Sequence, residues 1–223
     1  MQPWAAGRPP YVVGSVLQAT MASRATWGKD LILAQKCVAG DATAQRELFE
    51  REKRRVQSAL FRILGTNAHM DDLLQETFLA VFHGLPNFRG EATLATWIDR
   101  CAVHVALAYL TRQRPRAVHV ELVPDIPSGD ATAEQRALVR EAARRMYAEL
   151  DRIEPKHRLA FTLHAIEERP IAEVARLMDA SVMATKARIW RARRQLERRA
   201  RLDPVLATFL ADASKQRATE VDR

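Results

Sequence analysis

The sequence has few glycines, few cysteines and no long apolar run, and each shortage excludes a class of protein. Only eight of the 223 residues are glycine and no alternation of β-branched residues persists, so the pattern does not predict a sheet. Cys37 and Cys101 stand far apart and in no Cys/His cluster, which argues against a structural zinc site. No window approaches the roughly 20 apolar residues of a membrane span. We therefore expect an all-helical protein without a metal, a cofactor or a membrane segment.

Positive charge, by contrast, is abundant. The chain has 35 lysines and arginines against 27 acids, a formal net charge of +8, which favours a polyanionic partner such as nucleic acid. Eight of these basic residues lie between Lys186 and Arg201, where Glu197 is the single acid. A basic surface that serves only solubility is the alternative. The placement of the charge therefore matters more than its total.

The prolines, glycines and apolar residues divide the chain into two small helical domains. Residues 1–27 are expected to be a flexible extension, and helical patterns then run through 28–112. Prolines and a glycine interrupt 113–133, which predicts a flexible linker. Helical patterns resume over 134–202, and the tail at 203–223 has a short apolar stripe that we expect to pack. The expected fold class is all-α.

Several residues mark where helices begin and end. Gly40 and Gly65 are expected to end helices, and Asp41 is expected to cap the second helix, over about 42–64. Pro155 and Pro170 are expected in the first turns of two later helices. Four residues at helical spacing are expected to line one face of the first helix of the second domain: Leu138, Ala142, Met146 and Leu150.

Residues 171–201 have the pattern of a helix-turn-helix. A short helix is predicted from Ile171, with an apolar side that includes Val174 and Met178. Asp179 stands in the turn, at a position that needs a positive φ, which Asp tolerates. Ser181 then offers its hydroxyl to the free amides of the second helix. Because the second helix of this motif enters the major groove, the pattern predicts DNA binding.

A second informative pattern follows Asn67, where a helix is predicted to begin with two acids. Apolar residues such as Leu74, Phe78 and Phe82 are expected to point inward. A separate stripe at i, i+3, i+4 and i+7 shares another face. It comprises Asp72, Gln75, Glu76 and Leu79. The stripe is either a solvated face or a docking face for a basic, helical partner.

These segments resemble a known family. The sequences at 71–78, 87–91 and 96–98 resemble conserved region 2 of the extracytoplasmic-function sigma factors of bacterial RNA polymerase, and 171–196 resembles their region 4. The two resemblances follow the family's order, with a short linker where longer sigma factors have a third domain. They imply that 28–112 is region 2 and that 134–202 is region 4.

The resemblance also implies roles and partners. It implies a non-enzymatic initiation factor that binds core polymerase through the β′ clamp helices and the β flap, and that binds promoter DNA. Because the sequence has no convincing secretion signal, we also expect the protein to be cytoplasmic. The stripe would dock on the clamp helices. The −10 element would meet Asn87, Phe88, Arg89, Thr96, Trp97, Arg100 and His104. The −35 element would meet His164, Lys186, Ala187, Trp190 and Arg191. An anti-sigma partner is implied by the resemblance alone.

Some of these positions carry further expectations. Phe88 and Trp97 have aromatic faces on which unstacked bases could lie, although Trp97 is expected to belong to the core. His104 stands where some members have Asn. Ala184 and Thr185 replace the family's Thr-Val pair, which weakens an expected core anchor.

Two other functions stay open from the residues themselves. A stand-alone helix-turn-helix regulator would have an apolar pocket or a dimer seam and would need no docking stripe. A nucleic-acid-processing enzyme would use Asp71, Asp72 and Glu76 as metal ligands. These acids lie on one predicted helix, whereas metal sites of this kind draw ligands from several elements.

Overall fold

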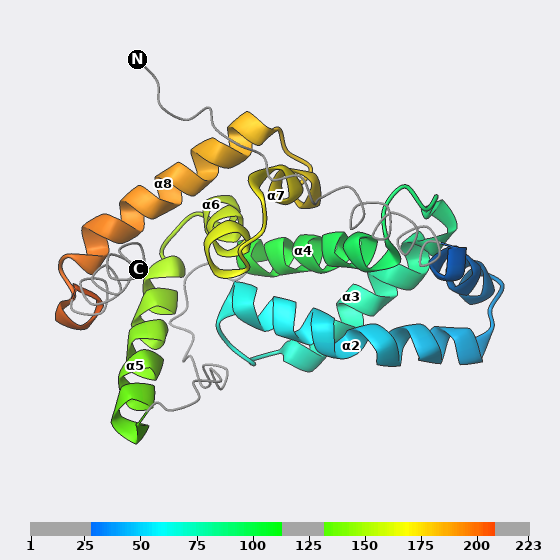
Figure 1. The fold of residues 1–223 in the computed structure, drawn as a ribbon, viewed down its shortest axis with the longest axis horizontal. Coiled ribbons are helices and arrows are strands. Elements are labelled where there is room, and N and C mark those ends of the chain that lie inside the picture. Colours follow the sequence, from blue (N-terminus) through cyan, green and yellow to red (C-terminus); the bar gives the residue numbers. More distant parts are fainter. Residues whose placement is uncertain (1–27, 113–131, 208–223) are drawn as a thin grey trace, which may run out of the picture.

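The structure is a computed structural model and describes residues 28–112 and 132–207. Within these ranges every regular element is a helix, which confirms the all-α class (Figure 1). The expected extension at 1–27, almost all of the expected linker and the end of the tail lie outside the described residues. Among the helices of these two ranges, none combines the length and the hydropathy needed to cross a membrane.

The first bundle begins with a helix over residues 28–38. It continues with α2 (Ala42–Leu64), α3 (Met70–Gly84), the short 3₁₀ helix η1 (Leu85–Asn87) and α4 (Leu94–Arg112). Asp41 caps α2 as predicted, since its Oδ1 accepts the Thr43 and Ala44 amides at 2.9 and 3.1 Å. Gly65, at φ 73°, ends α2 in the left-handed conformation that glycine adopts most readily.

Within 132–207, the second bundle is built of α-helices with one turn of π-helix, and its last described residues, 204–207, are helical too. The labelled helices are α5 (Ala133–Leu150), α6 (Pro155–Phe161), the π-helical η2 (Thr162–Ile166), α7 (Ile171–Leu177) and α8 (Val182–Ala200). Pro155 begins α6 as predicted, whereas Pro170 lies one residue before α7. On α5, Ala142 and Leu150 are buried, whereas the Leu138 side chain is 49% exposed.

The helix-turn-helix is formed by α7, the turn after it and α8. Asp179 has φ 48°, as predicted for the turn. The Ser181 hydroxyl accepts the Ala184 amide at 3.1 Å and so caps α8. Val174 and Met178 are buried on the inner side of the motif. These local expectations are confirmed.

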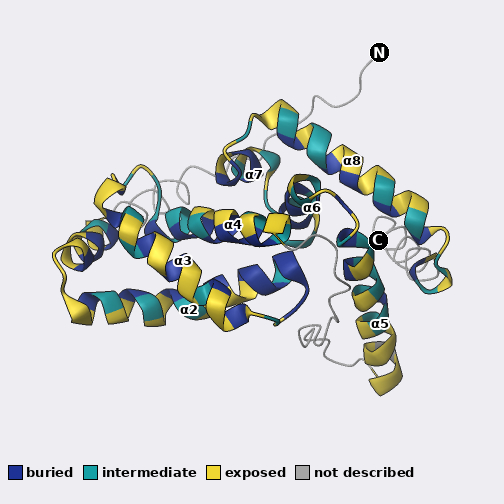
Figure 2. Cartoon of the chain, turned by 180° about the vertical axis from the view of Figure 1, so that it is seen from behind, coloured by how far each residue is buried: buried dark blue, intermediate teal, exposed yellow. Residues whose placement is uncertain are grey.

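The two bundles pack on each other, which the sequence did not predict. Helix α4 contacts α6 and α7, and α2 contacts η2. A single hydrophobic core includes Ile98 of α4 together with Leu159, Leu163 and Val174 of the second bundle. Figure 2 shows buried residues on the facing sides of α2, α4 and α6. A smaller core joins α5 to α8.

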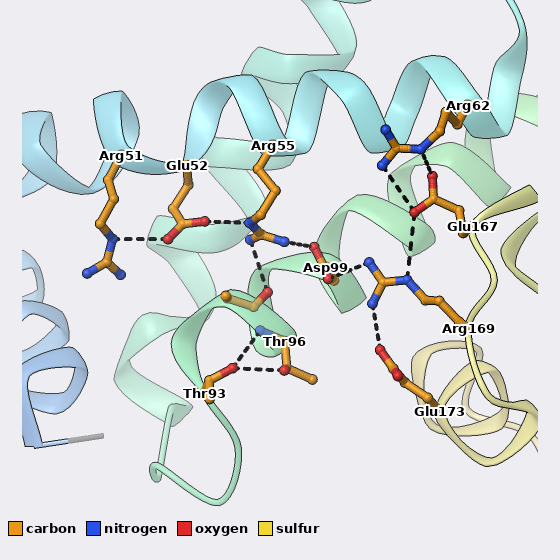
Figure 3. A network of polar contacts seen from close by, with 11 residues as sticks. Arg51, Glu52, Arg55, Arg62, Thr93, Thr96, Asp99, Glu167, Arg169 and Glu173 are labelled. Atoms are coloured by element: carbon orange, nitrogen blue, oxygen red, sulfur yellow. Dashed lines mark hydrogen bonds and ion pairs between the residues drawn. The ribbon is translucent and has the colours of Figure 1, made fainter. Parts of the chain in front are cut away.

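A network of charges crosses the contact between the bundles (Figure 3). Asp99 of α4 pairs with Arg55 of α2 and, at 2.8 Å, with Arg169 from the segment before α7. Glu167 pairs with Arg62 of α2. The side chains of Asp99 and Glu167 are only 8% and 5% exposed. Because a buried charge is costly without its partner, the network favours one orientation of the bundles.

Two side chains of the second bundle also hold the end of α2. Arg158 of α6 is 3% exposed and donates to the Ile63 and Leu64 carbonyls at 3.3 and 2.7 Å. These carbonyls lie in the last turn of α2, where no amide of the helix can reach them. The Tyr147 hydroxyl donates to the Arg62 carbonyl at 2.6 Å. Burial raises the pKa of Tyr147 to about 12, so this hydroxyl stays a donor.

Candidate polymerase and promoter interfaces

The acidic stripe of α3 lies on the surface. All four of its residues are exposed: Asp72, Gln75, Glu76 and Leu79. Leu79 is 51% exposed, an unusual position for a leucine unless a partner covers it, while Leu73, Phe78 and Val81 on other sides of α3 are buried. The Glu76 carboxylate accepts from Arg112 at 3.1 Å on the surface. The stripe is therefore accessible to a partner.

An open apolar hollow of about 410 Å³ lies beside this stripe, where α2 and α3 meet. Leu74 and Phe82, which were predicted to point inward, are half-buried and line it together with Phe49. Gln75 and Leu79 of the stripe also line it. The hollow and the stripe thus form one continuous surface.

The loop before α4 separates into exposed and buried residues. Asn87 and Arg89 are exposed. Phe88 is only 9% exposed and packs edge-on against the half-buried Trp97, with ring centroids 5.8 Å apart. In this arrangement the ring packs on the protein, and the stacking of a base on Phe88 stays a prediction. The rest of the loop remains available to DNA.

Arg100 and His104 of α4 contact the other bundle while they remain exposed to solvent. The Arg100 guanidinium pairs with the Asp179 carboxylate, and His104 Nε2 lies 3.0 Å from its second oxygen. The Thr96 and Thr93 hydroxyls lie 2.8 Å apart and hydrogen-bond to each other. Sequence inspection missed the role of Asp179, because no local signal links residues that are 79 positions apart.

The recognition helix α8 has one basic exposed side and one buried side. Lys186, Trp190 and Arg191 are exposed, while Ile189 and Ala192 are buried. The Arg194 guanidinium lies over the Trp190 ring at 5.2 Å, which orients the indole on the surface. This side of α8 has the shape and charge that the major groove accommodates.

Two other residues of the expected −35 set are less accessible. Ala187 is half-buried on α8. His164 is half-buried on η2, and its Nδ1 lies 2.9 Å from the Arg169 carbonyl.

Thr185, expected to be a weak core anchor, is fully buried, and its hydroxyl donates to the Ser181 carbonyl at 3.0 Å. That hydrogen bond satisfies the hydroxyl inside the core.

The described residues contain no group of three histidine, cysteine or acidic side chains placed to hold a metal ion. Cys101 is half-buried on α4, and burial raises the pKa of its thiol to about 11, so it is an unreactive packing residue. The fold and surfaces define a helix-turn-helix protein whose first bundle has an exposed acidic stripe.

Comparison with protein families matches both bundles. The Sigma-70 region 2 family matches residues 48–116, and the Sigma-70 region 4 family matches residues 143–196, together just over half of the chain. The sigma-E factor of Haemophilus influenzae is 29% identical over 177 residues, which span 75% of this chain and 93% of that protein. The sigma-E factor of Escherichia coli K12 is 28% identical over 177 residues, with 75% and 92% covered.

Solved structures share the fold. The structure of CnrH in complex with the cytosolic domain of CnrY has a TM-score of 0.54 and 24% identity, and the match covers 78% of this chain and 98% of CnrH. The chain belongs to the extracytoplasmic-function sigma factors of bacterial RNA polymerase. Sigma factors are non-enzymatic, so the family confirms an initiation factor over a processing enzyme, and a stand-alone regulator is not favoured.

Proposed function

We propose that residues 28–112 bind core RNA polymerase and the promoter −10 element, and that 134–202 bind the −35 element. One observation supports this division most strongly. The exposed acidic stripe of α3 and the exposed basic side of α8 lie on different bundles of one chain. A stand-alone regulator needs only the second of these surfaces. The proposed site of action is the cytoplasm, and the proposed regulatory partner is an anti-sigma factor.

The α3 stripe is proposed to dock on the β′ clamp helices of core polymerase. Asp72 lies in the first turn of α3 with its side chain 81% exposed, so its charge is available to a basic partner. Opposite charges on two surfaces speed their encounter and set their orientation. Leu79, on the same face, would supply apolar contact area. Charge and apolar area together favour a protein partner.

The −35 element is proposed to meet α8. Lys186 and Arg191 can bind phosphates or guanine edges, and Trp190 and Ala187 can contact thymine methyl groups. Because these contacts release counterions, binding would weaken steeply as salt rises. His164 would approach the DNA backbone from η2.

The −10 element is proposed to meet the loop before α4 and the polar side of α4. Asn87 and Arg89 are exposed, and Arg100 and His104 present donors. Thr96 and Trp97 are half-buried beside them. Side chains with N–H and hydroxyl donors suit a splayed single strand, whose backbone is charged and whose bases are unpaired.

Promoter-dependent run-off transcription with purified core polymerase tests the proposal. Asp72→Lys should lower core affinity about tenfold and lower transcription with it, because it reverses a charge on the proposed docking stripe. Glu134→Lys is the matched control, since Glu134 is also an exposed acid in a first helical turn, on α5. Binding of duplex DNA without any binding of core polymerase would contradict the proposal and favour a stand-alone regulator.

A further inference from the structure

The turn of the helix-turn-helix meets the polar side of α4. Asp179, in the turn between α7 and α8, pairs with Arg100 through one carboxylate oxygen. Its other oxygen lies 3.0 Å from His104 Nε2. Both partners belong to the proposed −10 site. One acid of the second bundle thus engages two cationic or donor side chains of the first.

The local backbone does not explain an acid at this position. Asp179 has φ 48°, a region where L residues are strained and where glycine fits without strain. The ion-pair contacts of the Asp179 side chain run to Arg100 and His104 of α4. Aspartate at 179 is therefore explained by its partners across the contact.

The chemistry of the carboxylate is that of a DNA phosphate. Both are anions that present oxygen acceptors, and arginine binds either one through its N–H groups. We propose that Asp179 occupies the place of a promoter phosphate between Arg100 and His104, so that region 4 covers the −10 site until DNA displaces it. This inference rests on the proposed −10 role of these two residues.

Other contacts between the two bundles hold Asp179 against Arg100 and His104. Arg169 pairs with the buried Asp99 at 2.8 Å, one residue from Arg100. The Tyr147 ring lies against Gly65, where an added Cβ would come within 2.2 Å of the ring. Displacing Asp179 therefore favours separation of the bundles as well as exposure of the −10 site.

The strength of the Asp179 contacts determines how much they reduce the affinity for a −10 strand. The Arg100, His104 and Asp179 side chains are 51%, 46% and 46% exposed, so solvent screens both contacts. A site that is free in only a fraction of the molecules binds with an affinity reduced by that fraction. Loss of the Asp179 charge should therefore tighten binding of a −10 strand about two- to tenfold.

The test measures fluorescence anisotropy of a labelled single strand on the full chain. The probe carries the −10 sequence that the wild-type protein with core polymerase selects from a randomised promoter pool. Asp179→Asn keeps a residue that tolerates positive φ and removes the charge, so it should bind the probe about two- to tenfold more tightly. Gly65→Ala, which forces Tyr147 to shift, should also bind more tightly.

Gly40→Ala is the matched control for Gly65→Ala. Gly40 has φ 84° and nothing within 4 Å of an added Cβ, so this variant has the same backbone strain without the contact. It should bind like the wild type. Unchanged binding by Asp179→Asn, while Arg100→Ala weakens binding, would overturn the cover and leave the −10 role intact. Unchanged binding by Arg100→Ala would overturn the −10 role and the cover together.

Discussion

The basic side of α8 and the polar side of α4 are both proposed to bind promoter DNA, yet they differ in access. Lys186, Trp190 and Arg191 are exposed on α8. On α4, Arg100 and His104 already meet a carboxylate of the other bundle. The chemistry of a surface comes from its own helix, but its availability comes from packing between helices that are distant in sequence. The following predictions test this difference, from the largest expected effect to the smallest.

Arg158→Ala should have the largest effect, a loss of about 3–5 kcal/mol in the free energy of unfolding. It would leave the Ile63 and Leu64 carbonyls without their donor and Asp151 without its ion pair. Burial already raises the pKa of Asp151, and Arg158 opposes that rise. Urea denaturation measures the loss. Arg193→Ala, on the exposed side of α8, should cost less than about 0.5 kcal/mol, and equal losses would contradict the capping role.

Arg191→Ala should lower −35-dependent transcription about tenfold, since a good arginine contact to DNA contributes about 1–3 kcal/mol. Binding of the −10 single strand should not change, because Arg191 is exposed on α8, whereas the proposed −10 residues belong to the other bundle. Run-off assays on promoters with and without the −35 element measure −35-dependent transcription. Fluorescence anisotropy measures binding of the −10 single strand. Equal losses in both assays would contradict the division between the two bundles.

Leu79→Ala should weaken core polymerase binding about fivefold, as expected for an apolar contact worth about 1 kcal/mol. Leu138→Ala on α5 is the matched control, because the two leucines are 51% and 49% exposed. Affinity can be measured by competition for labelled core polymerase. If the two variants bind equally, Leu79 is no part of the docking face.

Thr185→Val should have the smallest effect, within about 1 kcal/mol in either direction. Valine adds a methyl group in the core but removes the hydrogen bond to the Ser181 carbonyl. Thermal unfolding measures the change. A loss above about 2 kcal/mol would show that the hydroxyl is essential to the start of α8.

Local features of the fold were predictable because a few neighbouring residues determine them. Asp41, Gly65 and Ser181 mark helix ends through their own backbones and caps, and spacing alone placed Asp72 and Leu79 on one face. The contact of Asp179 with Arg100 joins distant helices, so no local pattern contains it. The burial of Phe88 and the exposure of Leu138 likewise depend on which helices pack over them.

The central claim is that the two DNA-binding bundles hold each other closed. Small-angle X-ray scattering tests it most directly through the radius of gyration of the full chain. Gly65→Ala, which places a methyl group against the Tyr147 ring, should give a larger radius than the wild type, whereas Gly40→Ala should not. Equal radii for all three proteins, with unchanged helix content by circular dichroism, would contradict the claim.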